Sequence, residues 1–177
     1  LYSPDPPVPE PNENTREMIQ QINEGRLVVN FIGHGGAALM AYFFRGSFQE
    51  GDYSYMTQVV NGERLPLVVA MACFNGIYAD PNVVSLAEEM TRKADGGAIA
   101  YMSASSLAGV FTNTFMNKAM FRHIFRGGVR QFGPSLALGK TDMLAAFPEA
   151  TLEPVLGMNL MGDPGQALAV PEGPDYV

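Results

Sequence analysis

Three short apolar runs constrain the fold of this chain more than any other feature of its sequence. They read RLVVNFIG (residues 26–33), LPLVVAMAC (65–73) and GAIAYMS (97–103). Their short length, and in the first two the many β-branched residues, are typical of buried strands. Segments with helical patterns precede and follow them. Alternating strands and helices predict the α/β class, with a mostly parallel sheet covered by helices on both faces.

Outside the three strands, helices are expected in four main segments, and most of the remaining chain should be loops. Five prolines in the first twelve residues indicate an extended linker or strap over residues 1–13. Residues 37–66 look irregular, apart from a helix near 53–60. The tail should hold a turn at 162–164 and a short final strand, and residues 171–177 should be a tail outside the domain. The four expected helices cover residues 15–23, 81–94, 114–125 and 134–146, the first capped at Asn14-Thr15 and the second opened by Asp80-Pro81.

Composition excludes several function classes. The net charge of −7 argues against a general affinity for nucleic acid, because phosphate binding needs clustered Lys and Arg. No apolar run approaches the roughly 20 residues that a membrane-spanning helix needs. The start of the chain lacks the zones of a signal peptide. Because the first residue is Leu1, the chain is expected to begin inside a longer product. A single cysteine among 177 residues excludes an internal disulfide and a Cys-x-x-Cys metal site.

Two chemically reactive residues stand at the ends of consecutive strands. His34 follows the first apolar run, and Cys73, the only cysteine, ends the second. Ligands of open parallel sheets bind outside the carboxyl ends of the strands. If the two strands are neighbours, both side chains emerge at the same edge. A nucleophilic thiol with an imidazole in reach is the pairing that covalent catalysis uses.

The glycines after His34 fit such a site. Gly35 and Gly36 leave backbone amides unobstructed by side chains. Acyl transfer needs N–H groups that bind the developing oxyanion. The amides of Gly35 and Cys73 are the predicted donors.

Simpler interpretations remain open at this point. A lone cysteine at a strand end is usually a small core residue. Glycines after a strand also occur in ordinary turns and phosphate loops, although the spacing here fits neither a dinucleotide fingerprint nor a P-loop. His123 lies in a helical pattern between two arginines and is expected to be a surface or half-buried helix residue.

In order along the chain, four segments resemble a known family. They are GRLVVNFIGHGG, VVAMACFNG, GGAIAYMSAS and NLMGDPGQAL. This order resembles the gingipain-type cysteine peptidases, peptidase family C25 of the caspase-like clan CD, over roughly residues 15–170. The resemblance implies a caspase-like three-layer α/β/α sandwich and a bacterial thiol protease. Residues 14–170 would form the carboxyl-terminal part of its peptidase domain.

The resemblance also implies roles for single residues. His34 would be the catalytic histidine and Cys73 the nucleophile, with oxyanion amides from Gly35 and Cys73. The loop after the third strand would line the substrate pocket. No cofactor would be required, although the family allows a structural calcium ion. The protein would be secreted or held at the cell surface. The pocket residues would be Ser103, Ser105, Ser106 and Gly109.

The sequence departs from the family at two points. Gly36 stands where Ser usually follows His-Gly, and Tyr42 is the nearest aromatic after that motif. The earlier half of the family's catalytic domain is absent, so a second chain or upstream segment is expected to complete it. Three functions follow from the resemblance. They are an endopeptidase acting through a Cys73 thioester, a cell-surface transpeptidase or sortase of a bacterial secretion system, and an inactive caspase-like binding module.

Overall fold

The main sheet has four strands in the order β1-β5-β6-β7. The computed structural model describes residues 10–41, 44–47, 54–149 and 152–170. Strands β1, β5 and β6 run parallel, and β7 pairs antiparallel with β6. The predicted class, α/β with a mostly parallel sheet, is confirmed. The strands span Val28–Ile32 (β1), Leu67–Met71 (β5), Ala100–Ala104 (β6) and Met158–Gly162 (β7).

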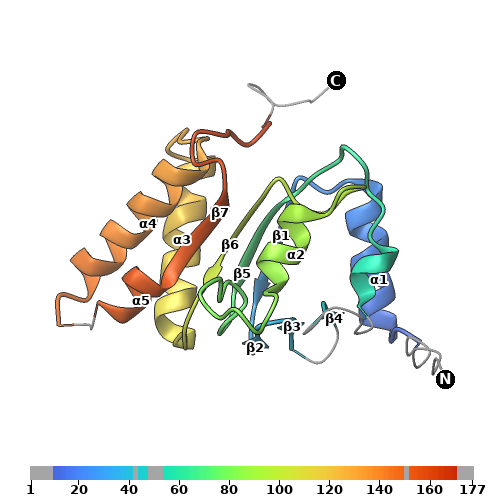
Figure 1. Cartoon of the computed structure of the whole chain (residues 1–177). Coiled ribbons are helices and arrows are strands. Elements are labelled where there is room, and N and C mark those ends of the chain that lie inside the picture. Colours follow the sequence, from blue (N-terminus) through green and yellow to red (C-terminus); the bar gives the residue numbers. More distant parts are fainter. Residues whose placement is uncertain (1–9, 42–43, 48–53, 150–151, 171–177) are drawn as a thin grey trace.

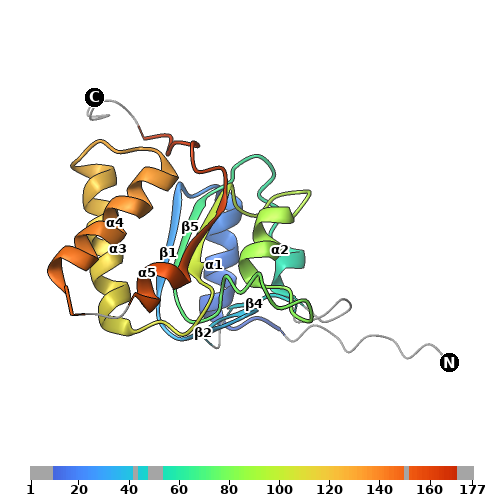
Figure 2. The same cartoon turned by 60° about the vertical axis from the view of Figure 1, so that its left-hand side comes forward.

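Helices cover both faces of this sheet. Helices α1 and α2 lie on one side, and α3, α4 and α5 lie on the other, as Figures 1 and 2 both show. The sheet and the two helix layers together form a three-layer sandwich. The helices span Glu13–Glu24 (α1), Leu86–Arg92 (α2), Val110–Phe125 (α3), Phe132–Ala146 (α4) and Glu153–Gly157 (α5), with a 3₁₀ turn at Tyr55–Gln58 (η1).

Alternate residues of the central strand β5 pack into two separate hydrophobic cores. Along β5, Val68 and Ala70 face the α1–α2 side, whereas Leu67, Val69 and Met71 face the α3–α4 side. All five residues of β5 are buried, as expected for a strand covered on both faces. The sheet is thus held rigidly between two apolar layers, which fixes where its strand ends point.

The first residues of α1 and α2 differ from those that the sequence predicted. The cap of α1 is Asn12, whose side chain accepts from the Thr15 amide, rather than Asn14-Thr15. Asp80-Pro81 does not open α2. That helix begins at Leu86, after a capping box in which Ser85 and Glu88 exchange hydrogen bonds. A complete capping box satisfies more of the free amides of the first turn than a proline at its start can.

A second, smaller sheet occupies the segment that looked irregular. Its strands β2 (Gly35–Gly36), β3 (Leu39–Met40) and β4 (Phe44–Arg45) are antiparallel and have two residues each. The expected helix near residues 53–60 is the short turn η1. The final strand, β7, precedes the 162–164 turn and is followed by a single bridge between Ala167 and Gln131. Residues 1–9 of the expected linker, Tyr42, Tyr53 and the 171–177 tail lie outside the described residues.

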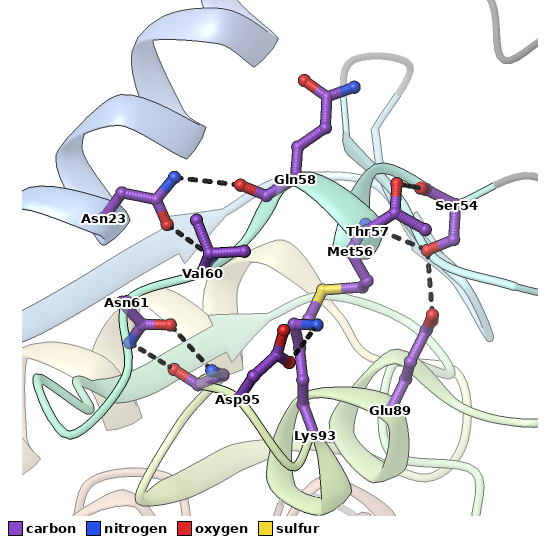
Figure 3. A network of polar contacts seen from close by, with 11 residues as sticks. Asn23, Ser54, Met56, Thr57, Gln58, Val60, Asn61, Glu89, Lys93 and Asp95 are labelled. Atoms are coloured by element: carbon purple, nitrogen blue, oxygen red, sulfur yellow. Dashed lines mark hydrogen bonds and ion pairs between the residues drawn. The ribbon is translucent and has the colours of Figure 1, made fainter.

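Side-chain amides tie the loops together at the amino-terminal edge of the sheet. Asn61 precedes β5, donates to the carbonyls of Arg64 (2.8 Å) and Gly97 (3.0 Å), and accepts from the Gly97 amide. Asn23 of α1 bonds in the same manner to the backbone of Gln58 and Val60 (Figure 3). This edge is therefore held by hydrogen bonds between side-chain amides and the backbone of its loops.

Within the described residues, no helix is long and apolar enough to cross a membrane.

Candidate active site

The sheet brings His34 and Cys73 to the same edge. Strands β1 and β5 are direct parallel neighbours, and their last paired residues are Ile32 and Met71. His34 and Cys73 each stand two residues beyond this pair. His34 is exposed and Cys73 is half-buried, so both are open to a molecule arriving at this edge. The thiol and the imidazole therefore share the position at which open parallel sheets bind their ligands.

His34 opens a hairpin that lies against the cysteine segment. We call residues 34–41 the histidine hairpin. The Ala41 amide donates to the His34 carbonyl (2.8 Å), which makes these two a hydrogen-bonded pair. Bonded and non-bonded pairs alternate along an antiparallel ladder, so the next pair, Gly35 and Met40, is non-bonded. The Gly35 N–H consequently points away from the hairpin and is free to serve another group.

Gly35 has to be glycine because the cysteine segment passes so close to it. A Cβ at this position would lie 2.7 Å from the Ala72 Cβ and 2.9 Å from the Cys73 carbonyl oxygen. Distances below 3.0 Å are not tolerated without movement of the backbone. Gly36 is different, because a Cβ there would meet only Leu39, at ordinary contact distances of 3.8 Å or more. The departure from the family's usual Ser is therefore not required by lack of space.

The Cys73 thiol contacts the loop that follows β6. Its Sγ accepts from the Ala108 amide (3.4 Å) and lies 3.6 Å from the Ala108 carbonyl. Both contacts are made with the backbone of the loop that carries the predicted pocket residues Ser105, Ser106 and Gly109. The next residue, Phe74, has a φ of 59°, an uncommon conformation for a residue with a Cβ.

Backbone strain in the described residues is concentrated here. The non-glycine residues with positive φ are Phe74, after the thiol, and Ala41, which closes the histidine hairpin. Such conformations cost about 1–3 kcal/mol each and persist where the surrounding structure enforces them. They often mark functional sites.

The predicted pocket residues differ in their accessibility. Ser103 is 1% exposed within β6, so it offers no surface to a ligand in this structure. The Ser105 hydroxyl donates to the Gly157 carbonyl (3.1 Å), and that of Ser106 to the Leu107 carbonyl (3.2 Å). Gly109 is exposed and precedes α3. The pocket role of these residues stays a prediction, now centred on the 105–109 loop next to Cys73.

Sequence reasoning missed one buried residue of this edge. Asn75 is completely buried two residues after Cys73, and its side chain bonds to the histidine hairpin. A polar amide directly after Cys-Phe, at the end of an apolar strand, was the available signal. A buried amide needs partners, and the partners had to come from a segment far away in the sequence.

The second histidine lies elsewhere, as predicted. His123 is a half-buried residue of α3, and its Nε2 is 2.8 Å from the Asp142 carboxylate of α4. That contact, together with Arg122, holds the pKa of Asp142 below its ordinary value. His123 thus belongs to a contact between two helices on one face of the sheet.

The described residues contain no group of three or more His, Cys, Asp or Glu side chains that could hold a metal ion. The structural calcium ion that the resemblance allows therefore has no cluster of carboxylates to bind it in this part of the chain.

One family model matches the chain, and solved structures share its fold. The family model described as Peptidase family C25 matches residues 7–169. The crystal structure of the Arg-specific cysteine proteinase gingipain R (RgpB) superposes with a TM-score of 0.74 at 19% identity, covering 90% of this chain and 37% of that one. The complex of Porphyromonas gingivalis RgpB pro- and mature domains gives 0.76 at 20% identity, covering 90% and 38%. No curated protein sequence matches significantly.

A further structure, described as "Structure of Protease", gives a TM-score of 0.70 at 14% identity and covers 84% of this chain and 37% of that one. At these identities, the superpositions establish the fold. This chain spans little more than a third of the length of each of the solved chains named here.

Proposed function

Because the chain belongs to peptidase family C25, we propose that it is the carboxyl-terminal part, residues 14–170, of the peptidase domain of a cysteine endopeptidase. One observation carries the proposal. The chain's only thiol, Cys73, and His34 extend two residues beyond the same aligned pair of neighbouring parallel strands. By analogy with the family, the protein would be bacterial and would act outside the cell or at its surface.

The proposed reaction proceeds through a thioester. The Cys73 thiol gives its proton to His34 as its Sγ attacks the carbonyl carbon of the scissile peptide bond, and the carbonyl oxygen becomes an oxyanion. The C–N bond then breaks, and the leaving amine takes up a proton from His34. Water attacks the thioester, releases the new carboxylate and regenerates the thiol. The free Gly35 N–H and the Cys73 N–H would stabilise both oxyanions.

The surface beside the thiol favours apolar groups of the substrate. The 105–109 loop carries the proposed pocket residues Ser105, Ser106 and Gly109. Next to Ala108, which contacts the thiol, the side chain of Leu107 is 64% exposed, and that of Phe111 in α3 is 70% exposed. The loop itself contains no acidic side chain. An arginine side chain of a substrate would find no counter-ion in this loop, so any such charge partner would come from outside it.

The proposed partner of this chain is a strand that lies beside β1. Within the described sheet, β1 pairs only with β5, which leaves its other edge without a strand neighbour. Ile32 on this strand is 41% exposed, and Asn30 is exposed. Unpaired strand edges readily recruit another strand. An upstream segment or a second chain that adds strands there would complete the domain.

This partner proposal predicts that the isolated chain does not behave as a stable monomer. Size-exclusion chromatography with light scattering should show self-association, and addition of the completing segment should convert it to a single complex. A monodisperse, fully folded monomer of this chain alone would contradict the proposal.

The function is tested with a peptide electrophile that captures thiols in peptidase sites. The completed protein should be labelled at Cys73, which mass spectrometry can assign because no other thiol exists in the chain. Competition by a cleavable peptide should protect it. A chain labelled no faster than free cysteine would instead be the inactive binding module. Transfer of the acyl group to an added amine, in place of hydrolysis, would indicate the transpeptidase.

A further inference from the structure

Asn75 joins the two halves of the candidate site. Its side chain is completely buried, and its Nδ2 donates to two carbonyls of the histidine hairpin, those of Gly36 (2.5 Å) and Leu39 (2.7 Å). The residue itself lies two positions after Cys73. A single amide group therefore bonds the hairpin that begins at His34 to the loop that begins at Cys73.

The orientation of this amide is fixed by its partners. The two hairpin carbonyls can only accept, so the NH₂ group must face them. On the opposite side, the Tyr101 hydroxyl donates to the Asn75 Oδ1 (3.2 Å). Burial raises the pKa of Tyr101 well above its ordinary value, so the phenol keeps its proton and remains a donor. All three bonds are satisfied in one arrangement, and a flipped amide would lose them.

Helix α2 holds the same two segments from a third side. The Leu86 amide in its first turn donates to the Ala37 carbonyl of the hairpin (2.7 Å), and the Ala87 amide donates to the Asn75 carbonyl (3.1 Å). The Asn75 backbone is therefore anchored independently of its side chain. Loss of the side chain would break both of its bonds to the hairpin, which would keep the Leu86–Ala37 bond, while leaving the cysteine loop in place.

We propose that Asn75 is a positioning residue that sets the place of His34 relative to Cys73 by holding the histidine hairpin against the cysteine loop. The proposal rests on the peptidase function proposed above. The exposed His34 has to reach the leaving amine while Cys73 holds the acyl carbon, and displacements of about 1 Å can cost about 10²-fold in rate. Asn75 touches neither substrate nor reacting atoms in this role.

The chain offers a closely matched control in Asn61. Like Asn75, it is a buried asparagine, 1% exposed, whose NH₂ group donates to two backbone carbonyls, those of Arg64 in its own loop and of Gly97 in a distant one. It lies at the opposite edge of the sheet, in the network of Figure 3. Asn61→Ala therefore removes the same chemistry without touching the candidate site.

The first readout is hydrogen exchange of the histidine hairpin, measured by mass spectrometry on the completed protein. In Asn75→Ala, amides of residues 35–41 should exchange at least about 10-fold faster, because two net hydrogen bonds are lost. The same peptide should be unchanged in Asn61→Ala. If Asn75→Ala does not fold, Asn75→Asp keeps the size but places a carboxylate oxygen, which cannot donate, against the two carbonyls. Unchanged exchange in the folded variant would overturn the proposal.

The second readout is a double-mutant cycle on peptide cleavage. Asn75→Ala should lower kcat by about 10–100-fold with little change in KM. In the His34→Ala background it should cost nothing further, because the group that it positions is gone. If Asn75→Ala instead lowered kcat by the same factor with and without His34, its role would be merely structural and the proposal would be overturned. Any loss in Asn61→Ala should be independent of His34 in this way. If the unchanged protein cleaved no peptide, the proposed peptidase function would be wrong. Hydrogen exchange would still decide whether Asn75 holds the hairpin.

Discussion

The Cys73→Ala protein should cleave its best peptide substrate at least about 10³-fold more slowly than the unchanged protein, both in the completed domain. Removing the nucleophile of a hydrolase abolishes the covalent route and leaves only the contribution of binding and oxyanion stabilisation. No second thiol in the chain can replace it. The measurement is the steady-state rate of cleavage, followed by mass spectrometry of the products.

The substitution is small enough to leave the fold intact. The Sγ makes only long contacts with Ala108, at 3.4 and 3.6 Å, so the change in the free energy of unfolding should stay near about 1 kcal/mol. Thermal melts of both proteins provide the control. Undiminished cleavage by a folded Cys73→Ala protein would show that the activity has another origin, and the proposed mechanism would have to be abandoned.

His34→Ala should produce the second-largest loss, about 10²–10⁴-fold in kcat, the range of general acid–base catalysis. Without the imidazole, the leaving amine must take its proton from water. Because the His34 side chain is exposed, its removal should hardly alter stability. Cleavage assays with and without added imidazole measure the effect, and a small base that enters the vacated space should restore part of the rate.

His123→Ala is the matched control for this prediction. It removes the only other imidazole of the chain, which contacts Asp142 of α4. The cleavage rate should stay unchanged. Melting temperatures separate any effect of that lost contact from an effect on catalysis. Equal losses in the two histidine variants would indicate a global cause and would remove the special role of His34.

The position of the site was predictable because it depends on strand ends. Apolar runs that stop at His34 and Cys73 reveal both the strands and the edge that they share. Their parallel order was predicted from the alternation of strands and helices along the chain, although among the described residues only the short turn η1 and strands β2 to β4 lie between β1 and β5. Neither step requires knowledge of long-range contacts. The same reasoning located Gly35, whose conflict with the cysteine segment only the folded chain makes visible.

The small sheet and the first residues of two helices could not be predicted in this way, because no local sequence pattern reveals the contacts that determine them. Strands β2 to β4 have two residues each, too few for a periodic signal, and β2 and β3 are held by the side chain of Asn75. Asp80-Pro81 looked like a helix start, but the capping box of Ser85 and Glu88 determines where α2 begins. In both cases a tertiary or capping interaction overrode a local preference. Helix α3 starts at Val110 rather than Thr114, with Gly109 at its cap position and no side-chain cap.

The contact between Cys73 and Ala108 has a consequence for how the protein is made. It joins residues 35 apart in the sequence, and the bonds from Asn75 to the hairpin join residues 39 and 36 apart. Contacts of such separation form only as the sheet itself folds. During synthesis, the Cys73 thiol therefore leaves the ribosome before Ala108 has been made, and the candidate site is assembled only when the fold is complete.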